Sequence, residues 1–131
     1  KNKKLLKYVI NKLNNNKIRT SLFINPNISD VKLSKELGSK CIELHTGKIS
    51  NKIKNNQNYS KEYNLIKKCS KYAVQIGLEV HAGHGMDYKT ARILNKITEI
   101  EEFNIGHFII GESVFFGFKK VINKFNKIIR R

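Results

Sequence analysis

The sequence lacks long hydrophobic runs and tryptophan, and its 131 residues include only 1 proline, 2 cysteines and 10 acidic residues. No segment approaches the roughly 18 consecutive apolar residues of a membrane-spanning helix, so we do not expect an integral membrane protein. The two cysteines, Cys41 and Cys69, are too few for a disulfide framework, and a reducing cytoplasm is the compartment that we expect. Hydrophobic residues form 40% of the chain, which is enough for one globular core and too many for a wholly disordered chain.

The charge is strongly unbalanced, because 26 lysine and arginine residues outnumber 10 acidic residues and give a net charge of +16. Such a charge is typical of nucleic-acid binding. The lysines are scattered, however, and outnumber the arginines by 22 to 4, whereas dedicated nucleic-acid binders rely on arginine and on stacking aromatic residues. A coding bias toward A/T-rich codons would produce the same composition. We therefore do not expect nucleic acid as the main partner, although a basic surface would still attract anionic small molecules.

Apolar residues recur with two periods that alternate along the chain. Spacings of three and four residues predict amphipathic helices at about 5–13, 29–37, 59–76, 87–95 and 111–129. Short β-rich runs predict strands at 18–24, 41–45, 78–82 and 103–105. Ser29 is the expected N-cap of the second helix. The asparagine-rich segment 50–58 is predicted to be a solvated loop.

This order, one helix followed by four strand–helix units, predicts parallel strands with helical crossovers in an α/β fold. Two architectures satisfy it, a doubly wound open sheet and part of a (β/α)8 TIM barrel. No G-x-G-x-x-G follows the first strand, so a dinucleotide-binding version has no support. A complete barrel needs about 250 residues, and this chain has about half of that.

Four histidines are placed where parallel α/β folds build their sites. The histidines His45, His81, His84 and His107 are all predicted at or just after the carboxyl ends of strands, and none in a helix. Glu43 shares a strand face with His45, and a carboxylate in the middle of a covered strand must be paired or used. It either forms a salt bridge with a lysine at the sheet rim or stabilises a cation and moves a proton in a pocket.

Two glycine-containing turns have the composition of ligand-binding loops. Gly83 and Gly85 flank His84, and glycines let backbone N–H groups approach a ligand while the histidine acts as an acid or base. Gly106 and His107 precede a helix expected to begin near Gly111, and such helix starts bind phosphate. Each turn could equally be an ordinary loop.

A metal centre is the competing interpretation of the histidines. The spacing matches no short signature, because neither H-E-x-x-H nor paired C-x-x-C is present. His81 and His84 are three residues apart, but across a glycine-rich turn and not on one helical face. We therefore expect no metal, and we expect Cys41 and Cys69 to be buried small apolar residues.

Taken together, five segments resemble the pyridoxine 5′-phosphate synthase family of vitamin B6 biosynthesis. In order along the chain they read S-L-F-I-N-P-N (21–27), I-E-L-H-T-G (42–47), H-A-G-H-G-M (81–86), F-N-I-G-H (103–107) and I-I-G (109–111). The resemblance covers essentially the whole chain. It implies a TIM barrel enzyme that condenses 1-deoxy-D-xylulose 5-phosphate with 3-amino-2-oxopropyl phosphate, giving pyridoxine 5′-phosphate, phosphate and water. It also implies a cytoplasmic homo-oligomer, an octamer, that needs no metal or organic cofactor.

The resemblance assigns roles to five residues. Glu43 matches the carboxylate that stabilises the transition state, and His84 matches the proton donor. Gly85, Gly106 and His107 match residues that hold the phosphate of the aminoketone. The sequence departs from the family pattern at Asn25 and Asn27, which replace aspartates of a turn, at His81, which replaces an asparagine, and at Glu112.

Other parts of the family pattern have no counterpart in these residues. An early N-x-D-H segment, a histidine and a glutamate that act as bases, and phosphate-binding arginines are absent from residues 1–131. We therefore expect the chain to be the C-terminal half of a synthase, a partial single domain spanning 1–131 and inactive alone. A non-catalytic phosphate-binding remnant and a basic nucleic-acid-binding module are the alternatives.

Overall fold

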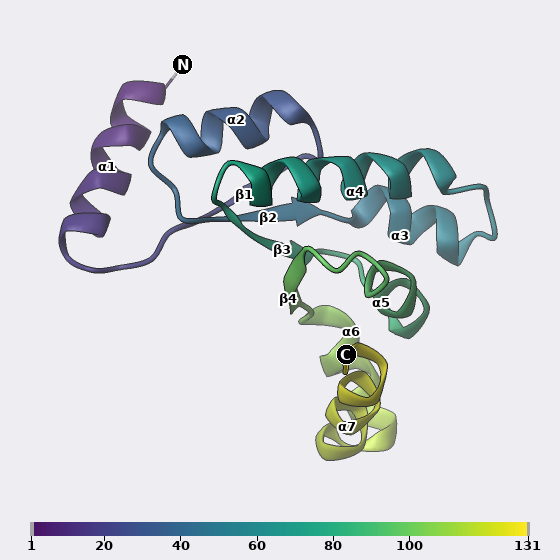
Figure 1. Cartoon of the computed structure of the whole chain (residues 1–131). Helices are drawn as coiled ribbons and strands as arrows, with labels where there is room; N and C mark the ends of the chain where they lie inside the picture. Colours follow the sequence, from purple (N-terminus) through teal and green to yellow (C-terminus); the bar gives the residue numbers. More distant parts are fainter. Residues whose placement is uncertain (1, 131) are drawn as a thin grey trace.

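Helices and strands alternate along the chain in the computed structural model, which describes residues 2–130 (Figure 1). The strands are β1 (Ser21–Ile24), β2 (Cys41–His45), β3 (Glu79–Gly83) and β4 (Ile100–Asn104). The helices are α1 (Lys3–Asn15), α2 (Ile28–Glu36), α3 (Gly47–Lys54), α4 (Ser60–Gln75), α5 (Tyr88–Leu94), α6 (His107–Phe116) and α7 (Phe118–Ile129). The predicted order of one helix followed by four strand–helix units is confirmed.

The four strands form one parallel sheet in the order β1-β2-β3-β4. A doubly wound sheet reverses its strand order at a switch point, whereas a barrel adds each new strand beside the last. The order found here has no reversal. The fold is therefore α/β with sequential parallel strands, which is consistent with part of a TIM barrel.

The two faces of the sheet differ in character because successive side chains of a strand point to opposite sides. Ile42 and Leu44 of β2 and Val80 and Ala82 of β3 are fully buried in a core with helices α2, α3, α4, α5 and α7. The opposite face carries polar groups, among them Glu43 and His45, as the predicted alternation required.

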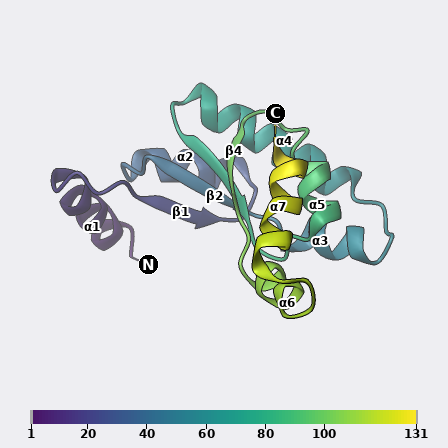
Figure 2. The same cartoon turned by 90° about the horizontal axis from the view of Figure 1, so that it is seen from below.

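Apolar side chains remain exposed at the edges of the sheet and on α6. Strands β1 and β4 each have one neighbour, and Phe23 on β1 is 54% exposed. Helix α6 buries none of its residues, and an exposed apolar surface runs along it into α7, formed by Ile110, Val114, Phe115, Phe116 and Phe118. Figure 2 shows α1 at the left end of the molecule, apart from α6 and α7. No helix within residues 2–130 is long and apolar enough to cross a membrane.

The prediction of a loop at 50–58 is wrong for its first half, which belongs to α3. Ile49 and Ile53 lie four residues apart on one face of this helix and are both 1% exposed in the core. Ser50 is buried as well, and its hydroxyl donates to the carbonyl of Thr46 at 2.8 Å. Two apolar residues at helical spacing outweigh the polar composition around them.

Three predicted boundaries also need correction. Asn27, not Ser29, caps α2, because its Oδ1 accepts a hydrogen bond from the N–H of Asp30 at 2.8 Å. The expected single last helix is two helices, since Gly117 adopts a φ of 80°, which α-helical geometry does not allow. Strand β4 begins at Ile100, three residues before the predicted start at Phe103.

An ion pair between α3 and α4 generates a prediction about acid stability. Lys52 Nζ lies 2.9 Å from a carboxylate oxygen of the buried Glu62, and this hydrogen bond lowers the pKa of Glu62. A carboxylate with a depressed folded-state pKa stabilises the fold above its unfolded pKa of about 4.3 and loses that contribution as the pH falls through the folded value. We expect Lys52→Gln to reduce the free energy of unfolding in urea at about pH 7, with a much smaller effect at about pH 3.

Lys54→Gln is the matched control, because Lys54 is exposed on the same helix. If both variants lose the same amount of unfolding free energy at neutral pH, the Lys52–Glu62 ion pair does not stabilise the fold.

Candidate active site

A pocket of about 440 Å³ lies at the carboxyl ends of β3 and β4. Its lining includes His84 and Gly85 from the loop after β3, and Gly106 and His107 after β4. Four of the five predicted site residues therefore line one pocket. Residues 84–86 and 104–108, which are distant in the sequence, meet there because β3 and β4 are parallel neighbours, so their carboxyl ends share one edge of the sheet.

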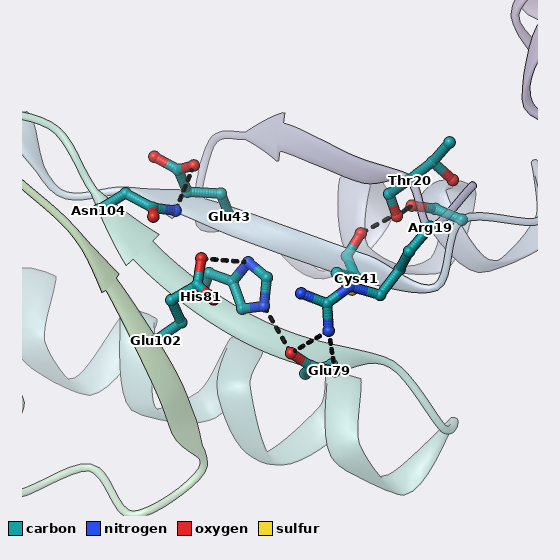
Figure 3. A network of polar contacts seen from close by, with 9 residues as sticks. Arg19, Thr20, Cys41, Glu43, Glu79, His81, Glu102 and Asn104 are labelled. Carbon is teal, nitrogen blue, oxygen red and sulfur yellow. Dashed lines mark hydrogen bonds and ion pairs between the residues drawn. The ribbon is translucent and has the colours of Figure 1, made fainter. Parts of the chain in front are cut away.

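Glu43 is joined to this pocket through Asn104. The side-chain amide of Asn104, which lines the pocket, donates to Glu43 Oε2 at 2.8 Å (Figure 3). The predicted alternative, a salt bridge with a lysine, is not found within residues 2–130. A Cβ on Gly83 would overlap the Glu43 carboxylate, so only glycine at this position of β3 lets the carboxylate lie across the strand.

The backbone holds His84 in an unusual conformation. His84 has a φ of 80°, in the left-handed region that is costly for a residue with a side chain, and Gly85 follows at a φ of 71°. The buried Thr46 braces this turn, since its hydroxyl lies 2.7 Å from the carbonyl oxygens of both Gly83 and His84. The Thr46 N–H also donates to the Gly83 carbonyl at 2.8 Å.

The imidazole of His84 is stacked on that of His45. Their ring centroids are 4.6 Å apart at an interplanar angle of 26°. The ring of Phe23 packs against both, with centroid distances of 5.1 Å to His45 and 6.4 Å to His84. The Gly47 N–H donates to Nδ1 of His45 at 3.3 Å, so the proton of a neutral His45 ring lies on Nε2. A Cβ on Gly47 would collide with both imidazoles, and glycine there permits the stack.

The second half of the pocket is the start of α6. This helix begins at His107, so the expected start near Gly111 and the placement of every histidine outside helices are both wrong. Gly106 is the N-cap and offers no side-chain cap, and no acidic residue lies in the first turn. The backbone N–H groups and the positive end of the helix dipole are therefore available to an anion in the pocket.

The structure corrects the prediction for His81. It is the third of five residues in β3, is 3% exposed and lies between two carboxylates on the polar face of the sheet (Figure 3). Its Nε2 is 2.8 Å from Glu79 Oε1, and Nδ1 is 3.7 Å from Glu102 Oε1. The hydrogen bond from His81, together with Arg19, lowers the pKa of Glu79. His81 is thus separate from the pocket that holds His84.

Other groups of interest lie outside this pocket. A larger hollow of about 670 Å³ is lined by residues 116–120 and by lysines of α7, and contains none of the predicted site residues. Glu112 faces a different hollow, which it shares with Tyr88. Cys41 and Cys69 are fully buried, and burial raises the pKa of both thiols, that of Cys69 to about 11, which disfavours a nucleophilic role.

Three residues that position the site were not singled out in the sequence. Asn104 and Thr46 lie inside the quoted motifs N-I-G-H and I-E-L-H-T-G, but their hydrogen bonds reach other strands, so no local pattern reveals their partners. Phe23 has the spacing of an ordinary strand residue. The signal that could have identified Thr46 is its place directly after a strand that ends in histidine.

A parallel α/β sheet with acid–base side chains and an uncapped helix start at its carboxyl edge is an arrangement that can bind a small anion and transfer protons. Comparison with known proteins agrees. The family model described as "Pyridoxal phosphate biosynthesis protein PdxJ" matches residues 1–131. This chain belongs to that family.

Curated relatives carry a consistent name. The chain is 60% identical over 131 residues to pyridoxine 5′-phosphate synthase of Pelagibacter ubique, covering 100% of this chain and 55% of that protein. It is 43% identical to the synthase of a Sulfurihydrogenibium species, covering 95% of this chain and 50% of that protein. It is 38% identical to the synthase of Campylobacter fetus, covering 95% of this chain and 57% of that protein. The chain thus spans about half the length of the curated relatives that it matches.

The brace under His84 yields a direct prediction. We expect Thr46→Val, which keeps the shape of the side chain, to lower the free energy of unfolding by about 0.5–1.5 kcal/mol, because the hydroxyl that donates to the turn is lost while the backbone N–H still donates to the Gly83 carbonyl. The His84 turn should loosen, which amide hydrogen exchange in residues 83–86 would detect.

Thr90→Val is the matched control. Thr90 is also buried, but its Oγ1 has no hydrogen-bond partner among the described residues, so its replacement should be neutral or stabilising. If both variants exchange like the wild type in residues 83–86, Thr46 does not brace the turn.

Proposed function

We propose that this chain supplies the proton-donating and phosphate-binding part of a pyridoxine 5′-phosphate synthase site. The reaction condenses 1-deoxy-D-xylulose 5-phosphate with 3-amino-2-oxopropyl phosphate to give pyridoxine 5′-phosphate, phosphate and water. The observation that carries the proposal is the single pocket lined by His84, Gly85, Gly106 and His107 with Glu43 one hydrogen bond away. The names of the curated relatives support it.

His84 is the proton donor in this proposal. An imidazole gives up or takes a proton near neutral pH, and a ring condensation that releases water needs a proton on each departing oxygen. The stack on His45 positions the ring, and the hydrogen bond from Thr46 holds the backbone of the turn that carries it. Restriction of this kind places the donor before the substrate arrives, which lowers the entropic part of the barrier.

Glu43 stabilises the positive charge that develops during the condensation. The aminoketone and the imine formed from its amine carry positive charge during the condensation, and a fixed carboxylate stabilises it in the transition state. Asn104 donates to Oε2, so that oxygen is held in place while Oε1 lies against Gly83. The protein thereby orients the carboxylate.

The phosphate of the aminoketone binds at the start of α6. Gly106 and His107 border the pocket, and the uncapped N–H groups of the first turn point toward the end of the helix where an anion is stabilised. The start of α5 is unsuited to this role, because the side chain of Asp87 accepts from the N–H of Thr90 and places a carboxylate there.

The rest of the site and of the barrel comes from outside these residues. We propose that residues 1–131 form one part of a single TIM barrel domain, the C-terminal half. Its remaining strands pair with the edges β1 and β4, and its helices cover the exposed apolar surface of α6. A cytoplasmic location and an octameric assembly belong to the same proposal. The substrate-binding arginines and the catalytic bases lie in the other half.

Turnover by the whole natural protein tests the proposal. We expect His84→Asn to reduce kcat by about 100- to 10,000-fold and Glu43→Gln by about 100- to 1,000-fold, because each variant removes a group used in the transition state. Product formation is followed by chromatography. Lys61→Gln, an exposed change on α4, serves as the control and should leave kcat unchanged. Wild-type activity in His84→Asn would refute the assignment of the proton donor.

Phosphate affinity tests the second part of the pocket. We expect His107→Ala to weaken binding of inorganic phosphate by about 10- to 100-fold, measured by calorimetry, because a charge-assisted hydrogen bond is lost. Saturable phosphate binding without turnover in the whole protein would favour the phosphate-binding remnant. Binding of DNA that falls steeply with salt and ignores His107→Ala would favour the nucleic-acid module.

A further inference from the structure

A second group of reactive side chains lies on the polar face of the sheet, nearer the amino ends of the strands than the pocket. Cys41 of β2 and Glu79 of β3 are direct partners in the parallel register, and His81 is two residues further along β3 on the same face. One ligand atom from each of the three residues lies within 4.8 Å of the other two. The proposed reaction uses none of them, and Figure 3 shows them below Glu43 and Asn104.

The three donors are a thiol, an imidazole and a carboxylate, which is the ligand chemistry of Zn²⁺. We propose that Cys41, Glu79 and His81 form a zinc site that joins β2 to β3. Bonds of about 2.0–2.3 Å to a tetrahedral zinc ion place the donor atoms about 3.3–3.7 Å apart, so the present separations require shifts of about 1 Å or less. Thiolate and carboxylate together neutralise the charge of the ion, and a water molecule completes the four ligands.

The surroundings of His81 fit a metal ligand. Its Nε2 faces Glu79, and its other ring nitrogen, Nδ1, faces Glu102 Oε1 at 3.7 Å. Histidines that bind zinc through one nitrogen generally donate from the other to a carboxylate, which fixes the ring and raises its basicity. Glu102 occupies that position, and it comes from the neighbouring strand β4.

Arg19 holds the carboxylate when no metal is bound. Its Nη1 lies 2.8 Å from both oxygens of Glu79, and it is the cation that balances this carboxylate in the structure. Its side chain is 54% exposed, so it can turn into solvent when zinc takes its place. Arg19 therefore competes with the metal, and its removal should strengthen binding.

Cobalt(II) is the probe, because a thiolate ligand gives it a near-ultraviolet charge-transfer band and tetrahedral geometry gives strong visible bands. The whole natural protein, stripped with a chelator, is titrated with Co²⁺ and then with Zn²⁺. We expect saturation at one ion per chain, both sets of bands, and their loss as Zn²⁺ displaces Co²⁺. Saturable binding without the thiolate band, or no saturable binding, would overturn the proposal.

Substitutions assign the ligands. We expect Cys41→Ser to abolish the charge-transfer band, and His81→Asn to weaken Co²⁺ binding by more than about 100-fold. Glu102→Gln should weaken it by about 10- to 100-fold. Cys69→Ser, at the other buried cysteine, should bind as the wild type. Binding lost in His84→Asn but kept in His81→Asn would place the metal in the pocket and overturn the proposal.

Cys41→Ser and His81→Asn change buried residues and could prevent folding. Arg19→Gln provides a test that does not depend on them, because the Arg19 side chain is 54% exposed and its replacement should leave the fold intact. We expect this variant to bind Co²⁺ about 10-fold more tightly. Unchanged or weaker binding in Arg19→Gln would show that the guanidinium does not compete for Glu79, and would contradict the proposed ligand set.

Discussion

The parallel register between β2 and β3 is the constraint on which the rest of the structure depends. It places Glu43 beside His81 and His45 beside Gly83, and it lets Thr46 reach the carbonyl groups of the turn after β3. A slip of one residue would turn the polar face of β2 into the helical core and expose Ile42 and Leu44 instead. The burial of these two side chains therefore also fixes the position of the acid–base groups.

The same two strands separate two kinds of chemistry. At their carboxyl ends, small residues leave room for polar groups: Gly83 admits the Glu43 carboxylate and Gly47 admits the stacked imidazoles. Toward their amino ends, the face is filled by Glu79, which pairs with Arg19 and contacts His81. One end is thus open to a ligand, whereas the other is held together by ionic contacts or, as we propose, by a metal.

Much of this architecture could be predicted from the sequence. The period of the apolar residues correctly predicts the order of strands and helices, and the motifs predict four residues that line one pocket. The prediction of a loop at 50–58 was wrong because the burial of two side chains outweighs the polar composition of that segment. Ile49 and Ile53 pack into the core from one face of α3. The strand that carries His81 was predicted within one residue at each end, but His81 lies in its middle, and its contacts are with Glu79 and Glu102 and not with the pocket at the strand end. The contacts Asn104–Glu43 and Thr46–His84 join strands distant in sequence, and no local period encodes them.

The most direct test of the account is a crystal structure of the whole natural protein with pyridoxine 5′-phosphate bound. We predict that the product's phosphate lies on the N–H groups at the start of α6 beside Gly106 and His107. Its ring should lie within hydrogen-bond reach of His84, with Glu43 directed at the same ligand and β1 and β4 both paired with further strands. A product phosphate bound away from α6, with His84 and Glu43 out of contact, would contradict the central claim.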